Sequence, residues 1–232
     1  MYDFSRSGVE VLKKSLSRYV LTDEIYALLK DQIINHQIVP GEKINIDQLA
    51  RELEVSNIPI REALSRLTAE GLVNMVPFKG MYATDMTLQE LDEIFEIRME
   101  LECLAIRKAA SNIPNSLLVD LKMDMERWSN KKPEENTEKV NLIAEMNQSL
   151  HGLILDYCLN HTLKNLITMY IERIQRYLTV IQKRMDQQLI EEEWHEHMLV
   201  ISCLATRNVE EAEQALLKHL INSHTRTRSF FI

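Results

Sequence analysis

Cysteine, glycine and proline are all scarce in this chain of 232 residues, which contains 3, 5 and 5 of them. The three cysteines, Cys103, Cys158 and Cys203, lie far apart and form no Cys-x-x-Cys pair. An odd and dispersed set argues against a disulfide framework and against a cysteine-ligated zinc site. We therefore expect the thiols to be small buried apolar groups.

Long apolar runs are also missing, although 45% of the residues are hydrophobic. No run approaches the roughly 18 residues that a membrane-spanning helix needs. The beginning of the chain likewise contains no apolar core as long as that of a signal peptide. These absences predict a cytoplasmic protein without a membrane partner.

An excess of cations, which nucleic-acid-binding proteins usually have, is lacking too, because the formal net charge is −8. The acidity is uneven. Residues 1–84 hold 10 Lys and Arg against 11 Asp and Glu, a balance of −1, whereas residues 85–232 hold 17 against 24, a balance of −7. The first part can therefore bind DNA only if its few cations share one face.

The residues that interrupt helices are concentrated in one region. Three of the five glycines and three of the five prolines fall between residues 40 and 80, and from residue 85 onward only one glycine and two prolines occur. Apolar residues in that second part recur at helical spacing. The sequence therefore predicts a mainly α protein, with a small mixed domain at 1–84 and an antiparallel all-helical bundle at 85–232.

The expected elements of the first domain are a helix at 5–18, a helix capped by Thr22 that ends near His36, helices at about 45–53 and 57–70, and strands at 72–76 and 81–84. This is the order of a winged helix-turn-helix. The second domain is expected to begin with a helix whose start is a Thr87–Glu90 capping box. The remaining helices are predicted at 115–129, 136–157, 162–185, 189–206 and 209–226.

The segment Val55–Leu72, VSNIPIREALSRLTAEGL, predicts an amphipathic helix that ends at Gly71. Its buried stripe is Ile60, Ala63, Leu64 and Leu67, and its outward side carries Asn57, Arg61 and Ser65, with Arg66 beside them and Ser56 as the N-cap. A helix N-terminus attracts phosphate, and Arg and Asn side chains match the edges of guanine and adenine. We predict that this helix enters the major groove of DNA, with Lys79 and Gly80 of the wing as further contacts. An ordinary solvated helix face is the alternative.

Three histidines of the second domain, His151, His197 and His219, lie on three different predicted helices. Asn147 is four residues before His151 and therefore projects from the same side of its helix. Three imidazoles that converge inside a bundle can hold a divalent ion and leave positions open. Spacing alone leaves open whether they are ordinary core histidines.

Residues 40–84, PGEKINIDQLARELEVSNIPIREALSRLTAEGLVNMVPFKGMYAT, resemble the winged-helix domain of GntR-family bacterial transcription regulators. Residues 87–222 are similar to the FCD ligand-binding domain of the FadR subfamily, in the segments LQELDEIFEIRMELECLAIRKAA and EHMLVISCLATRNVEEAEQALLKHL. The resemblance implies a homodimer that binds a double-stranded DNA operator and responds to a small-molecule effector, commonly a carboxylate.

The resemblance also implies a site in the second domain. Many such domains bind zinc or a similar divalent ion through an Asp, a His four residues later and two further histidines, and the matching positions are Asn147, His151, His197 and His219. Asn147 stands where the Asp is expected, which predicts weaker metal binding or three imidazole ligands. Arg98 is the expected partner of an effector carboxylate, and pairing within the bundle is the alternative.

The first domain departs from the family pattern at two positions. The family usually has Arg where Asn57 stands, and often Ser, Arg or a similar residue where Asp47 stands. One cation is lost and an anion is gained, which predicts a different or weaker operator.

Two other classes of protein fit parts of the sequence. A metal-dependent helical enzyme could use the three histidines with Glu196 as a base, but no HExxH-type motif occurs and an enzyme needs no winged helix. A protein-interaction module whose helix-turn-helix no longer touches DNA would fit Asn57 and the acidic balance. We predict a transcription regulator and not an enzyme.

Overall fold

A computed structural model describes residues 6–131, 133, 135–181 and 187–231 of the chain. The chain divides into two compact units, residues 1–86 and 87–232, two residues beyond the expected boundary. Each unit is described by itself. Among the described residues, no helix combines the length and the apolar character that crossing a membrane requires.

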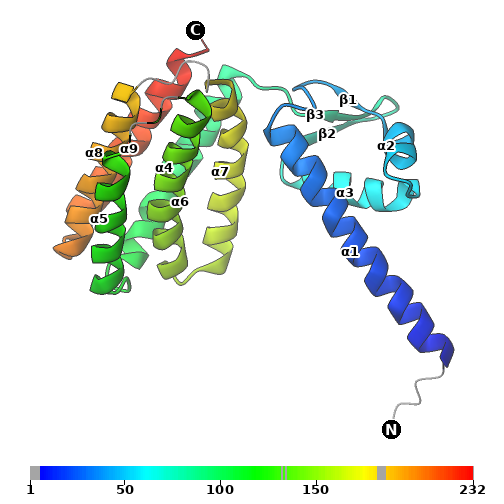
Figure 1. Ribbon diagram of the computed structural model, residues 1–232, viewed down its shortest axis with the longest axis horizontal. Helices are drawn as coiled ribbons and strands as arrows, with labels where there is room; N and C mark the ends of the chain where they lie inside the picture. Colours follow the sequence, from blue (N-terminus) through cyan, green and yellow to red (C-terminus); the bar gives the residue numbers. More distant parts are fainter. Residues whose placement is uncertain (1–5, 132, 134, 182–186, 232) are drawn as a thin grey trace. The chain divides into compact units, whose positions relative to one another are not determined.

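In unit 1, the part of the chain that the structure describes forms three helices and a small sheet (Figure 1). Its elements are α1 (Arg6–Ile34), β1 (Lys43–Ile44), α2 (Ile46–Glu52), α3 (Asn57–Ala69), β2 (Val73–Val76) and β3 (Gly80–Ala83). The strands are antiparallel in the order β1-β3-β2, so that the hairpin β2–β3 forms the wing. The predicted winged helix-turn-helix is thereby confirmed, whereas β1 is too short to have shown an alternating pattern in the sequence.

The prediction of two helices before residue 36 was wrong. One helix, α1, runs through the position where Thr22 was expected to act as an N-cap. The Thr22 side chain is buried, and its hydroxyl donates a hydrogen bond to Glu62 of α3 at 3.3 Å. A threonine hydroxyl can cap a helix or bind a side chain of another helix. The sequence shows the same residue in both cases, so it could not distinguish the two roles. Residue 5, where the first helix was expected to begin, lies outside the described residues.

The apolar stripe of α3 holds unit 1 together. Its residues Ile60, Ala63, Leu64 and Leu67 are fully buried, as predicted, and lie in one cluster with Ile25, Leu29 and Ile33 of α1. Burying a leucine or isoleucine side chain contributes about 1.5–3 kcal/mol. Gly71 ends α3 at φ +76°, in the left-handed region that glycine adopts without steric cost. The outward side of α3 is therefore fixed in position by its inward side.

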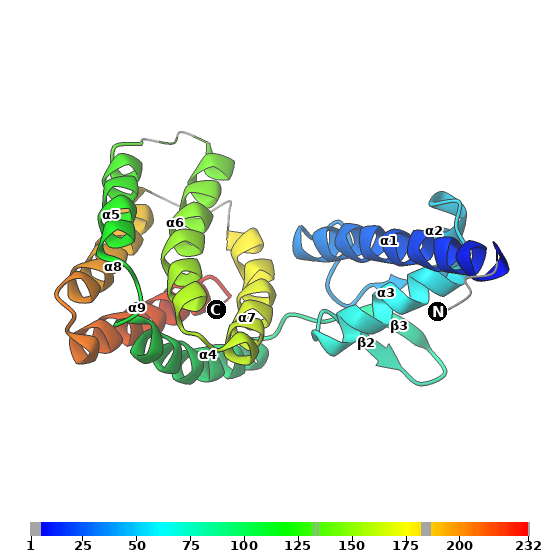
Figure 2. The same ribbon diagram turned by 90° about the horizontal axis from the view of Figure 1, so that it is seen from below.

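The described residues of unit 2 form a bundle of six helices (Figure 2). They are α4 (Leu88–Ala109), α5 (Asn115–Ser129), α6 (Asn136–Tyr157), α7 (His161–Ile181), α8 (Gln187–Ala205) and α9 (Val209–Ser229). Helix α4 packs against α6, α7 and α9, and α8 packs against α5, α6 and α9. All six were predicted, although the expected end of α7 at residue 185 lies outside the described residues. Cys103 and Cys158 are buried as expected, and Cys203 is only partly buried.

Half of the predicted capping box at the start of α4 is present. The Thr87 hydroxyl accepts a hydrogen bond from the Glu90 amide at 3.0 Å, but the Glu90 carboxylate binds Arg173, Arg176 and Tyr177 of α7 instead of turning back. The Thr87 amide donates to the Tyr177 hydroxyl at 3.1 Å. Tyr177 thus takes the place that the prediction gave to Glu90, and the start of α4 is tied to α7.

Candidate DNA-binding face and metal centre

The outward side of α3 carries the predicted DNA-binding residues. Arg61 and Ser65 are exposed and lie one helical turn apart, and Ser56 occupies the N-cap position. Ser56 is thus the N-cap as predicted, although its side chain makes no cap hydrogen bond. Lys79 is exposed in the turn of the β2–β3 hairpin, and Gly80 is exposed at the start of β3. In unit 1 a helix side and a wing are therefore both available to a duplex.

Asn57 and Asp47, the two departures from the family pattern, bind each other. The Asn57 amide nitrogen donates to Asp47 Oδ1 at 2.7 Å, which joins the first turn of α3 to the first turn of α2. Both side chains lie at the surface. The amide that was expected to meet a base is therefore already held by a carboxylate.

Arg66 faces α1. Its guanidinium lies 2.5 Å from Asp23 Oδ1 and 4.0 Å from the centre of the Tyr26 ring, close enough for a cation–π contact. Arg66 was predicted to lie beside the DNA-facing residues, but the packing of α3 on α1 engages its charge within the protein. Arg61 has the better position for a base or a phosphate.

Phe78 was not among the predicted DNA contacts. It lies in the wing turn at φ +63° and its side chain is fully exposed. Few non-glycine residues adopt this conformation, and an exposed aromatic ring there has no packing role in unit 1. In the sequence, Phe78 stands out as an aromatic residue between Pro77 and Lys79 in the expected turn.

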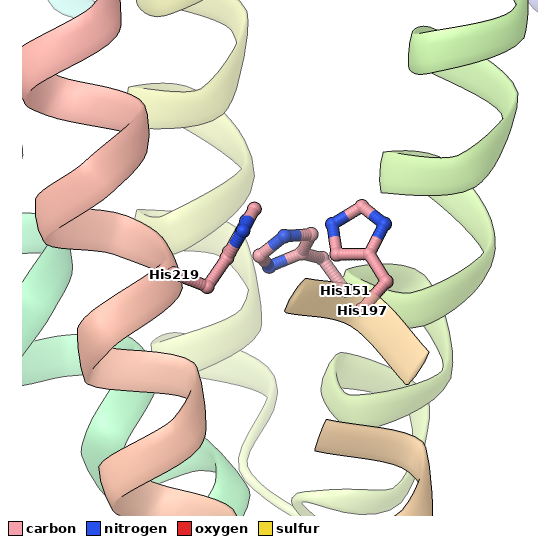
Figure 3. Close-up of side chains that lie close together, drawn as sticks. All are labelled: His151, His197 and His219. Carbon is pink, nitrogen blue, oxygen red and sulfur yellow. The ribbon is translucent and has the colours of Figure 1, made fainter. Parts of the chain in front are cut away.

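The three predicted histidines of unit 2 converge from three helices. His151 lies on α6, His197 on α8 and His219 on α9, and their rings point toward one another (Figure 3). The ring centres are 4.5 Å apart for His197 and His219, 5.4 Å for His151 and His219, and 5.8 Å for His151 and His197. One ring nitrogen of each lies within 4.8 Å of the others, and all three side chains are buried. The separation suits three ligands around one ion.

Several of these nitrogens have no partner within the described part of the chain. Both ring nitrogens of His197 and Nε2 of His151 are buried without a hydrogen bond. Burial lowers the pKa of His197 well below its ordinary value, and His219 and His151 lower it further, so the ring is neutral. A buried polar atom without a partner costs about 1–3 kcal/mol. Neutral imidazoles with available lone pairs are what a divalent ion needs, so the donor set fits a metal.

Two carboxylates orient the outer two rings. His151 Nδ1 lies 2.6 Å from Glu102, which also binds Arg98 at 2.8 Å. His219 Nδ1 lies 2.9 Å from Glu196. Such contacts fix the ring tautomer and direct the other nitrogen, Nε2, toward a metal.

Both carboxylates stay ionised. Burial alone would raise the pKa of Glu102, but Arg98 and His151 outweigh it and the pKa falls to about 2. Burial opposes ionisation of Glu196 too, and hydrogen bonds from Arg226, His219 and Asn222 bring its pKa to about 2. Sequence reasoning missed this outer layer, although Glu102 is one turn after Arg98 on the same helix face and could have been found.

Asn147 and Arg98 differ from the histidines. The Asn147 amide donates to the Ile143 carbonyl at 3.0 Å, and its side chain lines a cavity of about 30 Å³ together with Glu193 and Arg226. Arg98 is buried, its guanidinium forms an ion pair with Glu102 at 2.8 Å, and it lies 5.2 Å from the centre of the Phe95 ring. Of the two possibilities for Arg98, the structure has the pair within the bundle.

Known families match both units. The description "Bacterial regulatory proteins, gntR family" fits residues 21–82, and the FCD domain fits residues 93–222. The uncharacterized HTH-type transcriptional regulator YdhC of Bacillus subtilis is 32% identical over 84% of this chain and 86% of its own length. The HTH-type transcriptional repressor GlaR of Escherichia coli is 26% identical over 84% of this chain and 90% of its own.

Solved structures share the fold. Escherichia coli McbR/YncC superposes with a TM-score of 0.73 at 22% identity, over 91% of this chain and 99% of that one. A GntR-type regulator from Rhodococcus sp. RHA1 gives a TM-score of 0.68 at 18% identity, over 90% and 97%. The matched relatives are transcription regulators and not enzymes. The chain therefore belongs to the GntR family of bacterial transcription regulators, in the FadR-like group whose second unit is an FCD domain.

Proposed function

We propose that this DNA-binding regulator is a homodimer in the cytoplasm, and that a small carboxylate effector binds at a divalent metal in unit 2 and changes its affinity for the operator. The observation that supports a metal ion is the buried histidine cluster, in which nitrogens of His151 and His197 have no hydrogen-bond partner among the described residues. Core histidines that served packing alone would leave those atoms unsatisfied at a net cost.

His151, His197 and His219 would hold the ion, and Glu102 and Glu196 would orient two of the rings. When bound, a divalent ion supplies a Lewis acid with positions open to an effector carboxylate. Asn147 can offer only a neutral amide oxygen, which supports weaker metal binding than an Asp there would give. Arg98 can reach an effector only if it releases Glu102. We therefore propose that its main role is to hold Glu102, the carboxylate that orients His151.

Elemental analysis tests the metal. Protein purified without a histidine tag is compared with a His151→Ala/His219→Ala variant, because these two rings come from different helices. The wild-type chain is expected to carry zinc or a similar ion after dialysis, and the variant is expected to lose it. Equal metal content in the two proteins would refute the site. Circular dichroism shows whether the variant keeps its helices.

The proposed operator contacts are Arg61, Asn57 and Ser65 on α3, and Lys79 and Gly80 on the wing. Two winged helices in a homodimer would read two half-sites, which doubles the contacts of one. Sedimentation equilibrium tests the dimer, and a monomer at micromolar concentration contradicts it.

Arg61 gives the direct test of DNA recognition. We expect Arg61→Ala to weaken binding to a site selected from genomic fragments by ~1–3 kcal/mol. Arg127→Ala is the matched control, because Arg127 is an exposed arginine of unit 2. Unchanged binding by Arg61→Ala would remove Arg61 from the interface. A wild-type protein that prefers no duplex over random competitor would favour the interaction-module alternative.

A further inference from the structure

Glu193 is a buried carboxylate beside the histidine cluster, and it is not one of the metal ligands proposed above. It lies on α8 four residues before His197, so the two side chains share one face of the helix. Its residue is 5% exposed. One carboxylate oxygen, Oε1, binds Arg226 of α9. The other carboxylate oxygen, Oε2, accepts no hydrogen bond from any residue in the described part of the chain.

We propose that Glu193 Oε2 is the carboxylate ligand of the metal, in the role that Asn147 cannot fill. The proposal rests on the metal site proposed above. Oε2 lies 3.8 Å from His197 Nε2, which is too far for a hydrogen bond and near enough for the two atoms to share an ion. It is also 3.9 Å from His219 Nδ1, but that nitrogen is bound to Glu196. The unpartnered oxygen of Glu193 is thus close to the unpartnered Nε2 of His197.

The charges at the cluster point to a cation. Three buried or partly buried carboxylates, Glu102, Glu193 and Glu196, face two guanidinium groups, Arg98 and Arg226. Among these five groups the carboxylates outnumber the guanidinium groups by one. A buried charge is stable only when it is paired. A divalent ion would bind the free oxygen and would turn the excess of −1 into +1, which a single carboxylate of an effector would then neutralise.

The chemistry of the donors narrows the choice of metal. Imidazole nitrogens with one carboxylate suit zinc, nickel, iron or manganese, whereas magnesium and calcium prefer sites made of oxygen atoms. Glu193 also forms an ion pair with Arg226, so the experiment has to distinguish a metal ligand from a carboxylate that serves Arg226 alone.

The test is the zinc affinity of Glu193→Gln, measured by competition with a chromophoric chelator. Glutamine keeps the size of the side chain and an oxygen that can accept from Arg226, but it removes the charge. Mutation of groups in the outer layer of metal sites lowers affinity by ~10–100-fold, so loss of a direct ligand should cost at least that much. Glu192→Gln is the matched control, because Glu192 is the exposed neighbour on the same helix and changes the charge equally.

A second variant keeps the proposal testable if Glu193→Gln alters packing. Asn147→Asp in the Glu193→Gln background should restore zinc affinity, because it returns a carboxylate to the cavity that residues 147 and 193 both line. Cobalt-loaded protein adds a spectroscopic measurement, since its visible absorption bands should shift in Glu193→Gln and not in Glu192→Gln.

The outcomes separate this inference from the proposed function. If Glu193→Gln binds zinc as tightly as the wild type and leaves the cobalt spectrum unchanged, Glu193 is not a ligand and only the inference fails. If the wild type binds no zinc, or binds it as well without His151 and His219, the metal site itself fails. Weak binding by Glu193→Gln, with rescue by Asn147→Asp, supports both.

Discussion

Replacing Glu102 by Gln should destabilise unit 2 strongly. Glu102 is 2% exposed, accepts a hydrogen bond from Arg98 Nε at 2.8 Å, lies 2.8 Å from Arg98 Nη2 in an ion pair, and lies 2.6 Å from His151 Nδ1. A glutamine has no charge to offset Arg98, which is 6% exposed and cannot reach water without moving. The variant therefore leaves a buried cation without its partner.

Two estimates give a similar magnitude. A pKa of about 2 instead of the ordinary 4.5 means that the folded protein favours ionised Glu102 by about 3 kcal/mol. Breaking a buried ion pair by removing one partner costs about 3–5 kcal/mol. We expect Glu102→Gln to lower the free energy of unfolding of unit 2 by about 3 kcal/mol at pH 7.

Urea unfolding followed by tryptophan fluorescence is the suitable assay. The chain has two tryptophans, Trp128 and Trp194, and both lie in unit 2, so the signal reports that unit alone. Trp194 Nε1 donates to the Met125 carbonyl at 2.8 Å, which places this reporter between α8 and α5. EDTA in every sample separates the effect on the ion pair from any effect on metal binding.

Two further variants make the result specific. Asp124→Asn breaks an exposed pair with Arg127 and should cost less than about 1 kcal/mol. Arg98→Met/Glu102→Gln removes both buried charges and should be more stable than Glu102→Gln alone. If Glu102→Gln costs no more than Asp124→Asn, or if the double variant is the least stable, the reasoning about the buried pair is wrong.

Three other outcomes are expected. Zinc at 100 times its dissociation constant should stabilise unit 2 by about 2.7 kcal/mol relative to EDTA, and an unchanged midpoint would count against a folded-state site. The pKa values of Glu102 and Glu196 are lowered to about 2, so the stability that the two carboxylates contribute is complete above pH 4.5. The free energy of unfolding should decline as the pH falls from 4.5 to 2. The Glu102→Gln/Glu196→Gln variant is the control, and its free energy of unfolding should stay flat over this range. Asp47→Ala should strengthen operator binding by about 1 kcal/mol, because it removes one anion near the phosphates and releases Asn57. Fluorescence anisotropy measures the affinity, and weaker binding would mean that Asp47 positions Asn57.

Local patterns predicted most of the secondary structure. The i, i+3, i+4, i+7 stripe of α3 is a property of consecutive residues, and so is the left-handed Gly71 that ends the helix. The wing followed from a proline- and glycine-containing turn between two short apolar runs. Each feature depends on residues within about four turns of one another, which is the range over which a sequence can be read without knowing the fold.

Contacts between distant segments were the ones that failed. Thr22 binds Glu62, Arg66 binds Asp23 and Glu90 binds Tyr177, and each pair is separated by at least forty residues. A polar side chain in the sequence shows what it can bind and not which partner the packing will supply. The histidine cluster was predicted through resemblance, since spacing alone could not bring three helices together.

The two positions that depart from the family pattern, 57 and 147, are each accompanied by an acidic residue on a neighbouring segment, with opposite consequences. Asn57, where the family has a cation, binds Asp47, so the DNA-facing side loses positive charge and its recognition should change. Asn147, where the family has a carboxylate, lines the same cavity as Glu193, whose free oxygen faces the histidines. In the proposed metal site, Glu193 keeps the negative charge and only its helix of origin differs. The two proposals together predict a regulator that reads a different operator while it keeps a carboxylate beside the histidines.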